Sequence, residues 1–265
     1  MTREVYARPP LRLVIADLRY PFAPRLGSQE VLQNLTTLLR PIFPIPEAAG
    51  VQILMSVGGG GSTQTATQGA PNRFFSRERT TSVTVSPTNM AVETSDYGEY
   101  QKFRPVLRTC LETLASVDNL VGVERLGLRY INEIRVPGLS HPREWVEYLA
   151  PQYVKTLDVL ADKPIALSQS VVQSEPVDEI STVVRFGALR GQVVASVGPL
   201  RVAEVPANSP FFLLDFDNSW TSGDAFNEYS VDFVLDLADR LHAPIDDLFE
   251  GALTDPLRAL LRGQE

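Results

Sequence analysis

The run RLGLRYINEIRV at residues 125–136 constrains the fold most strongly, because apolar and charged side chains alternate along it. Successive side chains of a β-strand point to opposite faces of a sheet. The apolar face carries Leu126, Leu128, Tyr130, Ile134 and Val136, interrupted by Asn132. The charged face carries Arg125, Arg129, Glu133 and Arg135, with Gly127 and Ile131 between them. The run therefore predicts a strand with one face on a core and the other face bearing guanidinium groups.

The charged face has two interpretations. It is either the solvated side of a sheet, with Glu133 partly neutralising its neighbours, or the floor of a groove that binds an anion. Guanidinium groups make forked contacts with phosphate and carboxylate groups, including those of acidic peptides. The candidate ligand-binding residues are Arg125, Arg129, Arg135 and, from a later strand, Arg185.

The order of strand-like and helix-like segments predicts the fold class. Helical stripes at 28–39, which Ser28 can cap, and at 99–117 separate β-rich runs. Further strands follow residue 165, before two final helices. This order predicts an α+β fold, with mostly antiparallel sheets covered by helices in two similar-sized halves. The expected domains are 1–138 and 139–265, although the chain can also form one continuous unit. The halves share only a loose plan of strands covered by helices.

Two segments are expected to connect or to close the fold. Residues 58–72 contain four consecutive glycines but no following Lys-Ser or Lys-Thr pair, so they predict a connecting loop and not a phosphate cradle. Final helices are expected near 229–241 and 245–262, with Pro256 bending or splitting the second. That second helix is apolar enough either to close a core or to form a homodimer interface.

Composition indicates which partners and which cellular compartment to expect. The net charge is −8, which disfavours binding to nucleic acid or to an anionic membrane. Cys110 is the single cysteine, and the N-terminus lacks the apolar core of a signal peptide. No run of about 18 apolar residues is present to span a membrane. We therefore expect a cytoplasmic protein.

The stretch LLDFDNSW is the best candidate for chemistry. Asp215 and Asp217 are two residues apart on an expected strand, so both carboxylates project from one face. Such a pair can hold Mg²⁺ or Mn²⁺, with Asp224 or Glu228 completing the shell. Alternatively, the pair marks a strand leaving the core, or pairs with the arginine face as a structural network. No other cofactor is expected.

The remaining reactive side chains favour structural roles. Cys110 belongs to the apolar stripe of helix 99–117, which is typical of a core thiol. His141 lies near the start of an expected helix at 140–154, and His242 lies at an expected helix end, where it would act as a cap. No hydrolase or zinc-protease signature appears.

Several short motifs together carry a resemblance that spans residues 8–262. They are PPL near the start, YGEYQKF, LGLRYINEI, LLDFD and the closing LFEGALTDPLRALL. In this order they resemble a sporadically distributed, uncharacterised bacterial family whose hallmark is a Leu-Arg-Tyr-Ile-Asn strand. The resemblance implies no activity, cofactor or catalytic residue.

The leading hypothesis is a non-enzymatic binding or adaptor protein that uses a sheet surface to recognise an unknown protein or a small anionic ligand. The alternative is a divalent-metal-dependent enzyme acting on phosphodiesters, or a nucleic-acid-binding protein. In that alternative Asp215 and Asp217 are the metal ligands, and the arginine-lined strand face holds phosphate.

Overall fold

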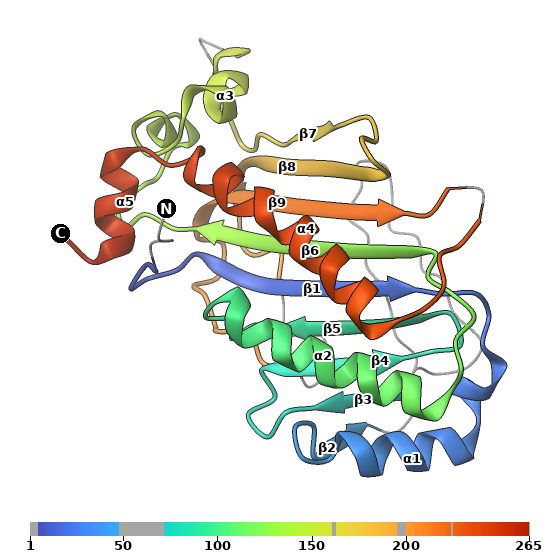
Figure 1. The fold of residues 1–265 in the computed structure, drawn as a ribbon. Coiled ribbons are helices and arrows are strands. Elements are labelled where there is room, and N and C mark those ends of the chain that lie inside the picture. The colour runs from blue at the N-terminus through green and yellow to red at the C-terminus, as the bar shows by residue number, and fades with distance from the viewer. Residues whose placement is uncertain (1–4, 48–71, 161–162, 195–199, 224, 265) are drawn as a thin grey trace.

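A single antiparallel sheet organises the protein, as seen in a computed structural model that describes residues 5–47, 72–160, 163–194, 200–223 and 225–264 (Figure 1). Helices cover one of its faces, so the expected α+β class is confirmed. Most of the glycine-rich loop at 58–72 lies outside the described residues.

The sheet contains nine strands in the order β2-β3-β4-β5-β1-β6-β9-β8-β7. Their bounds are β1 Leu11–Arg19, β2 Ile45–Glu47, β3 Asn72–Phe75, β4 Thr81–Val85, β5 Asn89–Thr94, β6 Arg125–Ile134, β7 Ser170–Gln173, β8 Ile180–Arg190 and β9 Pro210–Thr221. Strand β6 pairs antiparallel with β1 on one side and with β9 on the other. The sheet is thus continuous across the boundary expected near residue 138, and the division into domains stays a prediction.

The helices gather on one side of this sheet. They are α1 Gln29–Leu39, α2 Tyr100–Val117, α3 Pro151–Val154, α4 Val231–Glu250 and α5 Asp255–Arg262. In Figure 1, α1, α2 and α4 lie over the same face, and α5 lies at one end of the sheet beside the N-terminal segment. Among the described helices, none has both the length and the apolarity needed to cross a lipid bilayer.

Local sequence explains the first two long helices. The Ser28 hydroxyl accepts a hydrogen bond from the Val31 amide at 3.3 Å and thereby caps α1, as predicted. The apolar stripe of α2 packs into the core, and Cys110 is buried within it. Burial raises the pKa of the Cys110 thiol to about 12, so at neutral pH it is an unreactive thiol.

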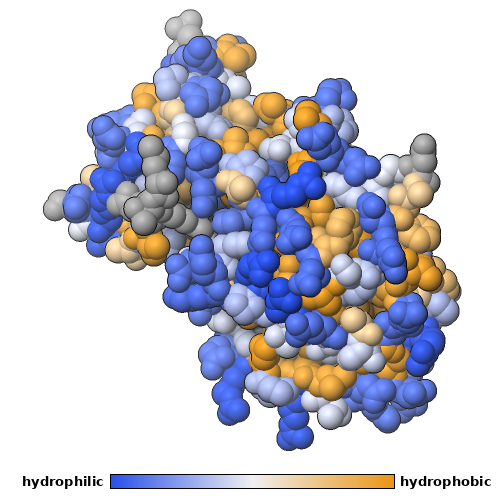
Figure 2. Space-filling view, in the orientation of Figure 1, coloured by the Kyte–Doolittle hydropathy of each residue, from blue (hydrophilic) through white to orange (hydrophobic). Residues whose placement is uncertain are grey.

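The core lies between the sheet and these helices. Leu126, Leu128 and Tyr130 of β6 are buried there, beside Phe216 of β9. The interrupting Asn132 is also buried, and its amide donates to the Leu214 carbonyl at 3.0 Å. On the outer side of the helix layer, hydrophilic side chains cover much of the surface, with smaller hydrophobic areas between them (Figure 2).

Each half of the chain follows the same order of elements. The first half runs from β1 through α1 and the consecutive strands β3, β4 and β5 to α2. The second half runs from β6 through short helical segments and the consecutive strands β7, β8 and β9 to α4. In the sheet, β1 and β6 lie side by side at the centre, flanked by β5 and β9, then by β4 and β8, then by β3 and β7. The topology is therefore two-fold related, with β2 as an addition to the first half.

The C-terminal helices break at a different place than expected. Helix α4 continues through Pro244 to Glu250, so the expected interruption between 241 and 245 is wrong. A proline removes one backbone hydrogen bond, and a long packed helix can absorb that loss by bending. The chain leaves the helix at 251–254, and Pro256 lies in the first turn of α5, where its missing N–H costs nothing.

The helix expected at 140–154 is also different. Residues Pro142–Glu147 form a 3-10 turn, and α3 begins separately at Pro151. The residue before a proline avoids the helical conformation, which separates the two segments. His141 caps the 3-10 turn: its ring accepts from the Arg143 amide at 3.3 Å, while Glu144 accepts from the His141 amide at 2.7 Å.

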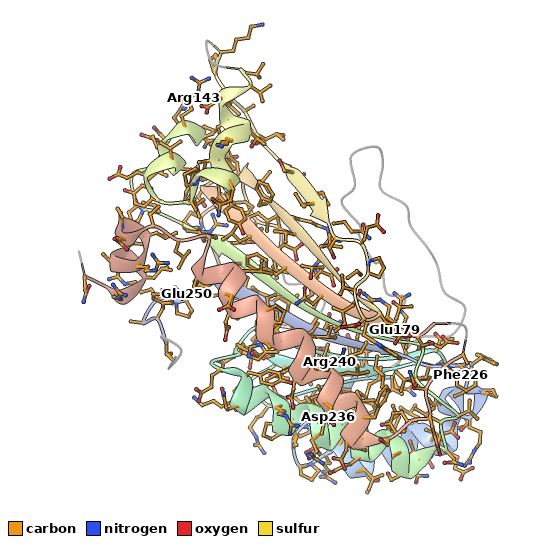
Figure 3. All side chains as sticks on the ribbon, turned by 45° about the horizontal axis from the view of Figure 1, so that its top comes forward. Arg143, Glu179, Phe226, Asp236, Arg240 and Glu250 are labelled. Atoms are coloured by element: carbon orange, nitrogen blue, oxygen red, sulfur yellow. The ribbon has the colours of Figure 1, made fainter. Side chains whose placement is uncertain are left out.

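Helix α5 closes the core over the N-terminal segment. Its Leu257 and Leu261 are buried in the main core. The Arg8 amide donates to the Leu261 carbonyl at 2.9 Å, and the Tyr6 hydroxyl donates to Glu250, at the end of α4, at 3.0 Å. Glu250 and the exposed Asp236 and Arg240 of α4 are labelled in Figure 3. These contacts favour core closure, and the homodimer stays a prediction.

We expect Leu128→Ala to lower the free energy of unfolding by about 2–5 kcal/mol, because it leaves a cavity in a closely packed core. Chemical denaturation of the wild type and the variant measures this loss. Val171→Ala on the edge strand β7 is the control, since Val171 is exposed and should change stability little. Equal effects of the two substitutions would contradict the assigned faces.

Deletion of residues 252–265 should abolish cooperative unfolding, because it removes the three buried leucines Leu253, Leu257 and Leu261 and uncovers the core beneath them. Circular dichroism during thermal unfolding, with size-exclusion chromatography, tests this. If the truncated chain remained a soluble monomer with a sharp transition, α5 would instead serve as an interface.

Candidate functional site

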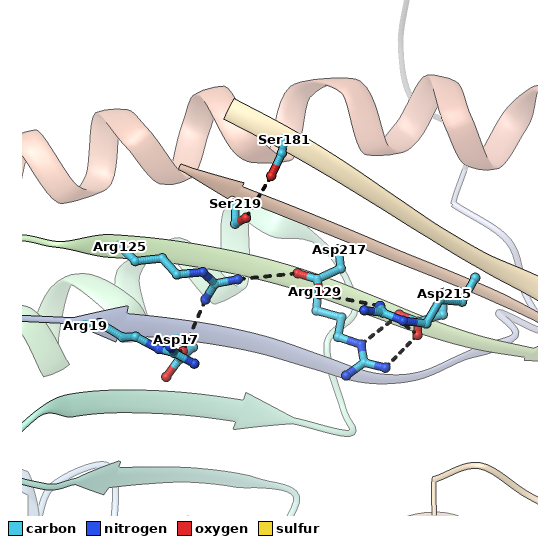
Figure 4. A network of polar contacts seen from close by, with 9 residues as sticks. Asp17, Arg19, Arg125, Arg129, Ser181, Asp215, Asp217 and Ser219 are labelled. Atoms are coloured by element: carbon cyan, nitrogen blue, oxygen red, sulfur yellow. Dashed lines mark hydrogen bonds and ion pairs between the residues drawn. The ribbon is translucent and has the colours of Figure 1, made fainter. Parts of the chain in front are cut away.

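The helix-free face of the sheet carries a row of paired charges, here called the arginine–aspartate ladder (Figure 4). Its members are Asp17 and Arg19 of β1, Arg125 and Arg129 of β6, Asp215 and Asp217 of β9, and Arg185 of β8. The register places Arg129 opposite Asp217, and Arg185 opposite Asp215. Because these positions share one face of the pleat, their side chains lie within reach of one another.

Asp215 is the centre of the ladder. Its side chain is only 1% exposed, and it accepts hydrogen bonds from Arg129 Nε at 2.8 Å and Arg129 Nη2 at 2.6 Å. Arg185 Nη1 donates to it at 3.4 Å. Burial lowers the pKa of the Arg129 guanidinium, but hydrogen bonds and attraction to Asp215 outweigh burial and raise it above its ordinary value. Arg129 is therefore a permanent cation that is fixed in place.

The remaining contacts extend the ladder across the sheet. Arg185 Nη1 also reaches Asp217 at 3.5 Å, and Arg125 lies between Asp217 at 4.0 Å and Asp17 at 3.3 Å. Gly127 makes this position of Arg125 possible, because an added Cβ would lie 2.7 Å from Arg125 Nη1. Ion pairs thus connect four neighbouring strands.

The ladder suits ion recognition and not proton transfer. The side chains of Arg129 and Arg185 are 34% and 29% exposed, so each remains partly accessible to solvent. Four arginines face three aspartates, which leaves one positive charge in excess. Arginine does not lose its proton in proteins, so these groups can hold an anion but cannot act as a base.

The structure brings together three of the four expected ligand residues. Arg125, Arg129 and Arg185 belong to the ladder, whereas Arg135 pairs with Glu133 at 2.7 Å at the other end of β6. One of the two interpretations placed Glu133 on a solvated face, but its side chain is fully buried. The reason is non-local: residues following β8 cover it, and the amides of Val193 and Val194 donate to it at 2.7 and 2.9 Å.

The expected metal ligands Asp215 and Asp217 are both paired with arginines of the ladder. Both oxygens of Asp215 already accept hydrogen bonds from guanidinium groups, and Asp217 contacts two arginines. Across the described residues, no group of three or more His, Cys, Asp or Glu side chains is arranged to hold a metal ion. Asp224 lies outside those residues. Binding of Mg²⁺ or Mn²⁺ at this pair stays a prediction.

A polar chain on the other face of β6 was not expected. His242 Nδ1 and the Tyr130 hydroxyl are 3.0 Å apart, and the Tyr130 and Tyr97 hydroxyls are also 3.0 Å apart. The Tyr100 ring stacks on His242 with a centroid separation of 4.0 Å. His242 therefore joins α2, α4 and β6 and does not cap a helix, which corrects its expected role. The sequence signal was its place in the buried stripe of α4, next to Leu241.

Comparisons of the chain with models of protein families, with curated proteins and with solved structures found no match. The resemblance to the bacterial family therefore stays an expectation, and the functional argument rests on the ladder.

We expect Arg129→Ala to lower the free energy of unfolding by about 1–3 kcal/mol. The substitution removes two hydrogen bonds from the buried Asp215 carboxylate and leaves it only the longer contact with Arg185. Arg19→Ala is the matched control: Arg19 is 59% exposed and pairs with Asp17, so its loss should cost less than about 1 kcal/mol. Urea denaturation of both variants measures the difference. A negligible effect of Arg129→Ala would show that the pair with Asp215 does not stabilise the fold.

Proposed function

We propose that the protein is a cytoplasmic, non-enzymatic binding protein whose arginine–aspartate ladder recognises anionic groups of a partner. The observation that carries this proposal is the arrangement of Arg129 and Arg185 around the buried Asp215. The carboxylate holds both guanidiniums in place while each remains partly exposed. A surface that is already ordered loses little entropy when it binds.

The hydrogen bonds leave binding capacity on both arginines. Arg129 contacts Asp215 through Nε and Nη2, and Arg185 contacts its two carboxylates through Nη1. In the described part of the structure, the other N–H groups of these two side chains have no ladder partner. A carboxylate of a partner can therefore accept from both arginines without displacing Asp215.

The alternative, a divalent-metal-dependent enzyme, has weaker geometric support. A metal ion at Asp215 would have to replace the hydrogen bonds from Arg129 and Arg185. It would also lie against two guanidinium groups, whose positive charges repel a cation. Calorimetric titration of Mn²⁺ distinguishes the two functions. Tight binding to the wild type but not to Asp215→Asn would support the metal enzyme.

A fluorescently labelled hexaglutamate peptide serves as the anionic probe. We expect it to bind the wild type with an affinity that falls as salt rises, and Arg185→Gln to weaken binding about tenfold. Arg240→Gln on the outer side of α4 is the control, because it removes the same charge from the opposite side of the molecule. Fluorescence anisotropy measures all three affinities. Equal binding by the three proteins, or no binding, would contradict recognition by the ladder.

A further inference from the structure

A recessed site lies at the C-terminal end of β6, outside the ladder. The cavity has a volume of about 430 Å³. Five parts of the chain form it: the segment leading into β1 with the start of that strand, Ser95 after β5, the end of β6, the connection between β8 and β9, and helix α5. This volume is in the range of pockets that take small organic ligands. The cavity and the ladder share no residue.

The polar wall of the cavity carries more positive than negative charge. Arg8, Arg12 and Arg135 line it together with the single carboxylate Glu133. Glu133 Oε2 lies 2.7 Å from Arg135 Nη2 and 3.6 Å from Arg12 Nε, so one buried carboxylate serves two guanidiniums. Its other oxygen, Oε1, accepts from the Val193 and Val194 amides. The group of Arg12, Glu133 and Arg135 therefore has a net charge of one positive unit.

Arg12 is the less compensated of the two guanidiniums. Its side chain is only 13% exposed. Burial lowers the pKa of the Arg12 guanidinium, and the negative charge of Glu133 offsets only part of this effect. Arg135 is held by Ser209, Gly191 and Glu133. Arg12 donates only to the Ala203 carbonyl among the described residues, and the buried Nε atoms of both Arg12 and Arg135 have no hydrogen-bond partner there. A buried cation in this state is stabilised by an added anion.

Apart from Ser95, the rest of the wall is apolar. Pro9, Pro10, Leu11, Val205, Leu260 and Leu261 line the same cavity. A ligand that satisfies both parts needs an anionic head for the guanidiniums and a hydrocarbon body for the leucines and prolines. We propose that this cavity binds a small organic monocarboxylate, with its carboxylate on Arg12 and its apolar body against α5. A single negative charge balances the single excess charge of the Arg12–Glu133–Arg135 group.

Hexanoate is the probe for this site, and hexanol is its neutral counterpart of similar length. We expect hexanoate to raise the melting temperature of the full-length protein in a concentration-dependent way, and hexanol to have no effect. Methyl signals of Val205, Leu260 and Leu261 should shift in nuclear magnetic resonance spectra during the hexanoate titration. Acetate should bind at least about tenfold more weakly than hexanoate, because it buries fewer methylene groups.

Arg12→Gln tests the charge. Glu133 keeps its contact with Arg135 in this variant, so the protein should fold, while the affinity for hexanoate falls at least about tenfold. Val205→Phe tests the cavity by filling it, and it should also weaken binding. Arg185→Gln, which alters only the ladder, should leave hexanoate binding unchanged.

Three results would overturn the proposal. One is the absence of hexanoate binding, and another is equal affinity in the wild type and Arg12→Gln. The third is displacement by inorganic phosphate with no advantage of hexanoate over acetate, which would show a plain anion site. Hexanoate binding tests the cavity, and hexaglutamate binding tests the ladder. Because Arg185→Gln alters only the ladder, either proposal can fail without the other.

Discussion

Strand β6 imposes the constraint on which both faces of the sheet depend. It pairs along its length with β1 and with β9, so its alternation of apolar and charged residues determines which neighbouring side chains face the helices. A slip of one residue would place Arg129 in the core and Leu128 among charges. Burial of Leu128 and pairing of Arg129 with Asp215 therefore select the same register. The hydrophobic layer and the ladder are two consequences of one alignment.

Because of the two-fold topology, both halves of the chain contribute residues to the ladder. Asp17 and Arg129 come from strands at the start of each repeated half, whereas Asp215 and Arg185 come from the last strands of the second half. The contacting residues Arg129 and Asp215 are 86 positions apart in sequence. The ladder therefore exists only after β1, β6 and β9 have paired. The proposed recognition at this face would therefore require complete folding, and pairing of distant strands is the slow part of folding in antiparallel sheets.

Features determined by local sequence were predictable, and features determined by distant segments were not. The Ser28 cap, the buried position of Cys110 and the two faces of β6 follow from spacing within one element. Pairing of the arginine face with Asp215 was one of several open interpretations, because it depends on which strand lies beside β6. The burial of Glu133 depends on a connection 60 residues away. Pro244 predicted a break in α4, but the helix continues through it, because packing in the fold outweighs the loss of one backbone hydrogen bond.

Asp215 and Glu133 are two buried carboxylates with similar surroundings. Each carboxylate is buried, and each contacts two guanidiniums, which leaves a positive excess on an acidic chain of net charge −8. The long-range field of such a chain slows the approach of anions. If the two proposed sites bind anions, binding would therefore depend on short-range contact, where the planar fork of arginine selects a carboxylate by geometry. A ligand of the right shape would then be favoured over one with more charge.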